Sequence, residues 1–250
     1  MVSQVKTRYC GRLSDSYLSL YWASLIVLIW FVSLVASLAL LSTQTPAVYL
    51  LLAVAVRTFS HTGLFIVTHE AIHHNISNSR KLNDAFGHIG SWFYALLFYE
   101  PLAKNHHLHH RFPTTEQDPD HHGRQTKGFW AWYAKFMSTY QADGQVWVSL
   151  VGFTVVFGIL MTCQISIANI LLFWVLPMVL SSFQLFTFGI YLPHRRSEKT
   201  SDDRHCARNI HVSAFWSFIS CYHFGYHLEH HLHPHLPWYQ LPQAYRCGNP

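Results

Sequence analysis

Histidines at metal-ligand spacing occur in three clusters of this sequence. They are H-E-A-I-H-H at residues 69–74, N-H-H-L-H-H at 105–110 and Y-H-F-G-Y-H-L-E-H-H at 222–231. Side chains three or four residues apart share one face of a helix. Each cluster can therefore direct two or more imidazoles toward one point, as binding of a metal ion requires.

The spacing H-x-x-H-H occurs twice, in the second and the third cluster, while His107 points away from the shared face. One more histidine stands alone in Y-L-P-H-R, at residues 191–195. His223 precedes His227 by four residues and is a possible additional ligand. The main candidates are nine: His69, His73, His106, His109, His110, His194, His227, His230 and His231.

The number of candidate ligands favours two metal ions over one. A catalytic zinc ion takes three protein ligands and water, which would leave most of these imidazoles unused. Two ions with four or five ligands each would use them all, and imidazole also suits iron. Neutral imidazoles leave a pair of Fe²⁺ ions strongly cationic, so that dioxygen or oxide ligands can share the charge. We therefore expect a di-iron centre.

Two other kinds of function compete for the same residues. H-E-x-x-H on a helix is the signature of zinc proteases, with Glu70 as general base. His194 would supply a third ligand, but both H-x-x-H-H clusters would then be surplus. A metal transporter would need polar or acidic ligands inside its membrane spans. The main ionisable residues there are Arg57 and His61, and an arginine is a poor ligand for a cation.

The elements that carry these histidines are predicted to be membrane helices. Half of the residues are hydrophobic and 12% are charged, against about 25% in soluble domains. Each of the four long apolar runs approaches or exceeds the roughly 18–20 residues that cross a bilayer. We expect an all-α integral membrane fold, one domain over residues 1–250, with spans at about 17–41, 47–68, 146–163 and 167–192.

Basic residues predict the orientation of these spans. All Lys and Arg except Arg57 lie in the N-terminal arm, in residues 69–145, or after Leu192. The positive-inside rule places these segments in the cytoplasm. We expect two helical hairpins, with both termini and a histidine-rich helical cap on the cytoplasmic side of a plasma or internal photosynthetic membrane. Residues 85–99 and 212–226 are expected to lie at the membrane face. Because the basic residues form no single patch, nucleic acid is not an expected partner.

Several longer stretches are similar to one family. They are G-L-F-I-V-T-H-E-A-I-H (63–73), H-H-L-H-H with its acidic sequel T-E-Q-D-P-D (106–120), F-Q-L-F-T-F-G-I-Y-L-P-H (183–194), S-F-I-S-C-Y-H-F-G-Y-H-L-E-H-H (217–231) and P-H-L-P-W-Y-Q-L-P (234–242). From about Tyr17 onward the chain resembles the bacterial and cyanobacterial-type β-carotene ketolases. These belong to the membrane fatty-acid desaturase and hydroxylase superfamily.

The resemblance implies an O2-dependent oxygenase that binds two Fe²⁺ through the nine histidines above. It implies that C4 of a β-ionone ring is hydroxylated twice, converting β-carotene taken from lipid to echinenone or canthaxanthin. Electrons would come from a soluble protein such as reduced ferredoxin. A carotenoid 3-hydroxylase and a fatty-acid desaturase of the same superfamily remain alternatives.

Acidic and aromatic side chains near the histidines are further candidates. Carboxylates often orient ligating imidazoles through the second ring nitrogen, and the candidates here are Glu70, Asp118, Asp120 and Glu229. Aromatic residues line either a polyene channel or the membrane interface: Trp92, Phe93, Tyr94, Phe98 and Tyr99. Positions that depart from the family pattern, and bear on ring selectivity, are Glu70, His74, His107, Leu232, His233 and Tyr239.

Overall fold

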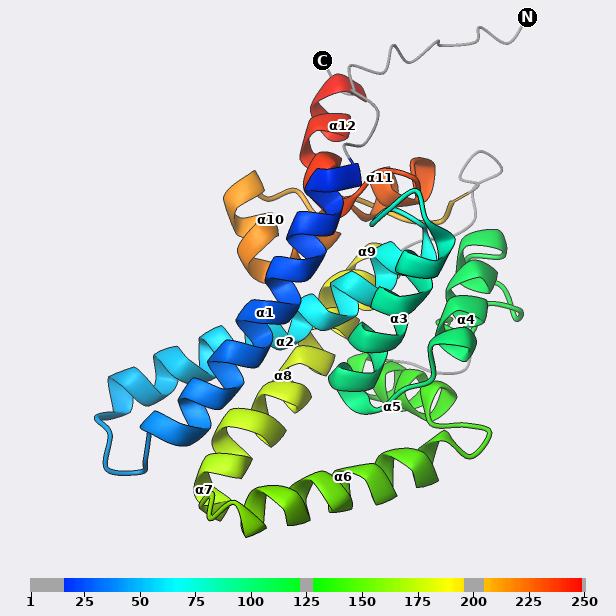
Figure 1. Ribbon diagram of the computed structural model, residues 1–250. Coiled ribbons are helices and arrows are strands. Elements are labelled where there is room, and N and C mark those ends of the chain that lie inside the picture. The colour runs from blue at the N-terminus through cyan, green and yellow to red at the C-terminus, as the bar shows by residue number, and fades with distance from the viewer. Residues whose placement is uncertain (1–15, 122–127, 196–204, 249–250) are drawn as a thin grey trace, which may run out of the picture.

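The computed structural model describes residues 16–121, 128–195 and 205–248, and within these ranges every regular element is a helix (Figure 1). The chain termini, for which the sequence predicts a cytoplasmic position, lie outside the described residues. Four of the helical segments are long and apolar enough to cross a membrane. The chain is a membrane protein of all-helical architecture.

The first pair of long helices comprises α1 (Ser16–Leu40) and α2 (Ala47–Ile72), which lie side by side and are joined by a short loop. Their bounds agree closely with the predicted spans 17–41 and 47–68. The exception is the end of α2, which continues to Ile72. That extra turn keeps His69 and Glu70 on the helix and leaves His73 at its C-cap.

The second pair comprises α6 (Gln145–Thr162) and a continuous helical run over Ile167–His194. This run consists of α7 (Ile167–Ile170), a π-helical turn η1 (Leu171–Val175), α8 (Leu176–Leu185), a second π-helical turn η2 (Phe186–Tyr191) and α9 (Leu192–His194). α6 and α8 diverge from the turn that joins them instead of lying against each other along their length (Figure 1).

Each π-helical turn precedes a proline, and the first shows why. Pro177 has no N–H to donate to the carbonyl of Phe173, four residues earlier. The wider turn leaves this carbonyl free, and it accepts a hydrogen bond of 3.0 Å from Nε of Arg57. Arg57 is fully buried and also donates to the carbonyl of Trp30 at 2.8 Å. The proline in the fourth span is thus accommodated by a side chain from the second.

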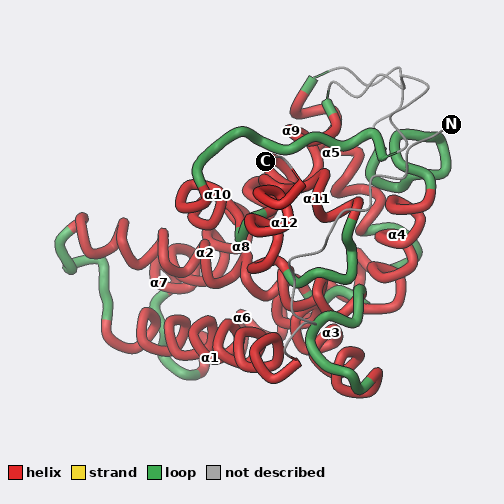
Figure 2. Tube along the Cα trace, turned by 90° about the horizontal axis from the view of Figure 1, so that it is seen from above, coloured by secondary structure: helices red, strands yellow, loops and turns green. Residues whose placement is uncertain are grey.

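Shorter helices gather at one end of the long ones, opposite the loops that join α1 to α2 and α6 to α7 (Figures 1 and 2). The two weakly apolar stretches form α3 (Arg80–Ala95) and α10 (Ala214–Cys221), both too short to count among the candidate spans. The remaining helices are α4 (Tyr99–Arg111), α5 (Phe129–Tyr140), 3-10 turns η3 (Phe224–Tyr226) and η4 (Trp238–Gln240), α11 (His227–Leu232) and α12 (Leu241–Gly248).

The position of α3 depends on a close crossing with α2. A Cβ atom at Gly90 would lie 2.6 Å from the carbonyl oxygen of Leu64 on α2, which is closer than real side chains approach. Only glycine permits this contact. It brings Tyr94, one turn further along α3, against the part of α2 that leads to His69.

Candidate metal centre

Four separated segments bring histidines to one place. The last turns of α2 carry His69, and α4 carries the H-x-x-H-H motif of residues 106–110. His194 ends the fourth candidate span, and α11 begins at His227. The structure therefore joins the three sequence clusters and the lone histidine.

The first candidate metal-binding cluster consists of His69, His73, His106 and His230, whose candidate ligand atoms all lie within 4.8 Å of one another. The Nε2 atoms of His73 and His106 are 2.7 Å apart, and those of His69 and His230 are 3.1 Å apart. Imidazole nitrogens this close repel each other unless a proton or a cation lies between them, so their spacing is compatible with a bound metal ion.

The second candidate metal-binding cluster consists of His109, His194, His227 and His231, which are all buried and whose candidate ligand atoms also lie within 4.8 Å of one another. Nε2 of His227 lies 2.9 Å from that of His194 and 3.0 Å from that of His231. Nε2 of His109 lies 3.2 Å from that of His231. Helices α4 and α11 thus each supply both clusters.

The ninth predicted ligand, His110, lies between the two clusters. Its Nε2 atom is 3.1 Å from Nε2 of His106 and 2.9 Å from Nε2 of His230, while its ring stacks on that of His231. The possible tenth ligand, His223, belongs to neither cluster. The backbone turns left-handed at this residue, with φ of 65°, and its ring stacks on Trp238.

The outward-facing nitrogens of three ligand candidates have acceptor partners. Nδ1 of His69 lies 3.3 Å from a carboxylate oxygen of Glu70, and Nδ1 of His194 lies 2.7 Å from the carbonyl of Cys206. Nδ1 of His109 lies 3.1 Å from each carboxylate oxygen of Asp118. A proton held on Nδ1 leaves the Nε2 lone pair facing the cluster, which is the tautomer a metal ligand needs. The donor set therefore fits two metal ions.

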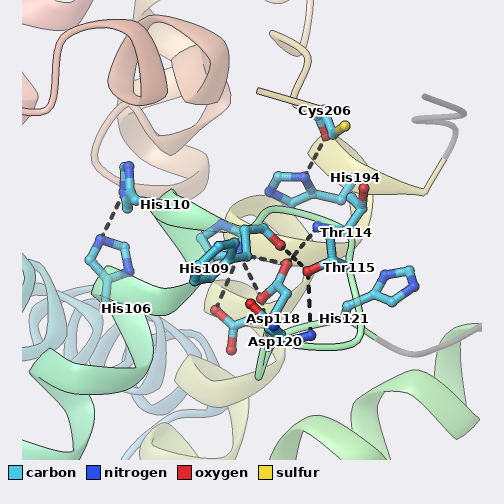
Figure 3. Close-up of polar contacts among 12 residues, drawn as sticks. His106, His109, His110, Thr114, Thr115, Asp118, Asp120, His121, His194 and Cys206 are labelled. Carbon is cyan, nitrogen blue, oxygen red and sulfur yellow. Dashed lines mark hydrogen bonds and ion pairs between the residues drawn. The ribbon is translucent and has the colours of Figure 1, made fainter. Parts of the chain in front are cut away.

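Asp118 is itself held rigidly, as the close-up shows (Figure 3). Its carboxylate accepts backbone N–H bonds from Thr114 at 2.8 Å and Asp120 at 2.9 Å. The neighbouring Asp120 accepts a hydrogen bond of 2.7 Å from the hydroxyl of Tyr140, and its own carboxylate lies 3.8 Å from Nδ1 of His109. Both predicted aspartates are buried beside one candidate ligand.

The two predicted glutamates differ in their surroundings. Besides its contact with His69, Glu70 accepts the backbone N–H of Trp238 at 3.3 Å. Its carboxylate therefore lies behind a candidate ligand, where it orients the ring. Glu229 accepts a hydrogen bond of 3.3 Å from Asn209, and this contact ties α11 to the segment that follows the fourth span.

Burial keeps most of the clustered imidazoles neutral. Desolvation, followed by the charges of neighbouring histidines, lowers the pKa of His110 to about 2 and lowers those of His73, His106, His227, His230 and His231 well below the usual value. His109 is the exception. Burial lowers its pKa, but the hydrogen bond and the charge of Asp118 outweigh that effect and raise it. Burial also raises the pKa of Asp120 to about 6.

A cavity of about 220 Å³ reaches the two candidate metal-binding clusters. Its inner end is bounded by His69, His106, His109 and His227, so both clusters contribute to it. The rest of the wall is mainly apolar and includes Phe65, Phe136, Met137, Phe153, Met178 and Leu185. These residues come from α2, α5, α6 and α8. An apolar molecule that entered between the diverging long helices would arrive directly at the histidines.

Of the five aromatic residues that the sequence suggests as lining for a polyene channel, one lines this cavity. Tyr94 lines the cavity, whereas Trp92, Phe93 and Phe98 are exposed and Tyr99 is buried against His88. Sequence reasoning missed the contribution of α5, whose aromatic run F-W-A-W-Y-A-K-F at residues 129–136 was an available signal. It also missed the Cys206 carbonyl, because a backbone acceptor carries no sequence signal.

A membrane-embedded helical fold with two histidine clusters, one fully and one partly buried, at the end of an apolar cavity is typical of an oxygenase of the desaturase type. Comparison with known proteins agrees. The model of the family described as fatty acid desaturase matches residues 44–150 and 139–247. The chain is 34% identical to a β-carotene ketolase of Paracoccus sp. (strain PC1), over 95% of this chain and 96% of that protein.

Two algal proteins extend the comparison. A β-carotene 4-ketolase 3 of Haematococcus lacustris is 35% identical over 85% of this chain and 67% of its own length. A zeaxanthin 4-ketolase of Chlamydomonas reinhardtii is 34% identical over 89% of this chain and 50% of its own length. The chain belongs to the β-carotene ketolases within the fatty acid desaturase family, and it is an oxidoreductase.

Proposed function

We propose that this protein oxidises C4 of the β-ionone ring of β-carotene to a ketone through two successive hydroxylations. Each hydroxylation consumes one O2, two electrons and two protons, and releases one water. The second gives a carbon with two hydroxyl groups, which loses water to leave the ketone. The observation that carries the proposal is the apolar cavity that ends at two four-histidine clusters.

The two clusters would each hold one iron ion. The first would use His69, His73, His106 and His230, the second His109, His194, His227 and His231, with His110 between them. Iron bound there would supply the activation of dioxygen. The chain's own contribution is to keep the imidazoles neutral by burial and to fix their tautomers through Glu70, Asp118 and the Cys206 carbonyl.

The cavity wall would position the ring and exclude water. C4 is allylic to the ring double bond, so its C–H bonds are weaker than those of the saturated ring carbons. An apolar wall that admits the ring end-on would bring C3 and C4 toward the histidines, and C4 has the weaker C–H bonds of the two. Asp120 and Tyr140, hydrogen-bonded to each other in the wall, are the groups best placed to exchange protons with the site.

The arrangement in the membrane forms part of the proposal. The basic segments favour a cytoplasmic position for both chain ends and for the histidine-bearing helices. The substrate would enter from lipid, where a C40 hydrocarbon resides. Electrons would arrive from a soluble reductant such as ferredoxin, which the basic cytoplasmic segments would attract.

Expression in bacterial cells that accumulate β-carotene tests the activity. We expect echinenone and canthaxanthin, identified by chromatography and mass spectrometry, and no accumulation when oxygen is withheld. Zeaxanthin as the sole new product would instead indicate a 3-hydroxylase. New unsaturated fatty acids with unchanged carotenoids would indicate a desaturase.

A further inference from the structure

One buried hydrogen-bond acceptor in the cavity wall would find no donor on an apolar substrate. Gln141, directly after α5, lines the cavity. Its Oε1 atom is withheld from solvent and has no hydrogen-bond partner among the described residues. Leaving a buried acceptor unpaired costs about 1–3 kcal/mol. A ring that offers only C–H groups cannot provide the missing donor.

Other polar side chains of the wall are already paired. Tyr133 and Ser182 lie 2.6 Å apart, hydroxyl to hydroxyl. Tyr140 donates to Asp120 at 2.7 Å. Gln141 follows Tyr140 in sequence and lines the same cavity as Asp120 and His109. The unpaired acceptor therefore belongs to a cavity that His109 and His227, of the second candidate metal-binding cluster, also line.

We propose that Gln141 accepts a hydrogen bond from a hydroxyl group on the carotenoid ring and thereby holds oxygenated rings in the cavity. This inference rests on the proposed function. The hydroxyl has two possible sources: the C4 alcohol formed by the first oxidation, or a C3 hydroxyl already present on the substrate. In the first case Gln141 retains the intermediate for the second oxidation. In the second case it favours hydroxylated substrates.

The test compares Gln141→Met, which removes the acceptor at similar length, with Gln141→Glu, which retains an acceptor oxygen. Met137→Leu, one helical turn earlier in the same wall, controls for altered cavity shape. Membranes containing each full-length variant receive β-carotene or zeaxanthin with a ferredoxin reducing system. The products are separated into alcohols and ketones, and iron content per chain confirms that the centre has assembled.

We expect the methionine variant to change one of two ratios by about three- to tenfold, as loss of one hydrogen bond implies. A higher ratio of 4-hydroxy to 4-keto product from β-carotene identifies the intermediate as the source. A lower ratio of zeaxanthin to β-carotene turnover identifies the substrate hydroxyl. The glutamate variant should keep both ratios closer to those of the unmodified protein.

Two results would overturn the assignment of Gln141. One is that both ratios in the methionine variant stay within the range of Met137→Leu, and the other is that the methionine and glutamate variants shift equally. In either case the unmodified chain still makes the ketone, so the proposed function stands. If the unmodified chain leaves C4 of both carotenoids untouched, the proposed function and the inference fall together.

Discussion

Both carboxylate oxygens of Asp118 lie 3.1 Å from Nδ1 of His109, and this contact turns the opposite nitrogen of the ring toward His231. The aspartate is nine residues further along the chain and is fixed by two backbone N–H groups. A loop that follows α4 thus determines the orientation of a side chain on α4.

Replacing Asp118 should therefore weaken the centre without removing a ligand. We expect Asp118→Ala to lower iron affinity by about 10–100-fold, which is typical for loss of such a partner. Iron per chain after dialysis against a graded chelator series measures the effect. Asp84→Asn is the control, since Asp84 makes an exposed contact with Arg80. Equal iron retention by both variants would contradict the role given to Asp118.

Two adjacent histidines give a direct test of the ligand assignment. His106 belongs to the first cluster, whereas His107 is exposed on the other side of α4. His106→Ala should lose most of the iron and at least about 100-fold in ketone formation, exceeding the loss of an outer partner. His107→Ala should retain both. If iron content falls to the same extent in each, the clusters have been assigned wrongly.

Stability of the metal-free protein should depend on pH. Burial lowers the pKa of six clustered histidines below the value of about 6.5 they have when unfolded. Below that pH the unfolded chain binds more protons, so the free energy of unfolding falls as pH falls. Each such histidine contributes up to about 1.4 kcal/mol per pH unit. Denaturation midpoints of chelator-treated protein in detergent, from pH 7.5 to 5.5, measure this slope, and a flat profile would exclude it.

Arg57 and Pro177 should be energetically coupled. Arg57→Met leaves the Phe173 carbonyl unpaired, at a cost of about 1–3 kcal/mol. Pro177→Ala restores an N–H that can bond the same carbonyl, so the double variant should recover part of the loss. A thermal-unfolding cycle of the four proteins measures the coupling. Strict additivity would mean that the two residues act independently.

The crossing of α3 and α2 gives a prediction with a matched control. Gly90→Ala must push α3 away from Leu64, and we expect a loss of about 1–3 kcal/mol. Gly158→Ala on α6 meets open space and should be neutral or stabilising by up to about 1 kcal/mol. Unfolding midpoints in detergent distinguish the two. Similar losses at both positions would refute the contact.

The sequence predicts the ends of the four long helices well because length and hydropathy determine them: every end agrees within four residues. It also predicts nine histidines that the structure brings close together, and their binding of metal stays a prediction. The sequence does not predict how the histidines divide between the two clusters. His106 and His109 lie on one face of α4 yet belong to different clusters, and only the placement of α11 and α9 decides this. The position of the cavity likewise depends on how α5 packs, which periodicity does not reveal.

Because α4 and α11 each serve both clusters, the two binding sites share their framework and cannot be altered separately. An inserted or deleted residue in α11 would rotate its later histidines by about 100° and would misplace ligands of both ions at once. The same holds for the histidine-bearing turns of α4, which also serve both clusters. Binding of two iron ions should therefore be cooperative: the first ion would order the histidines that bind the second.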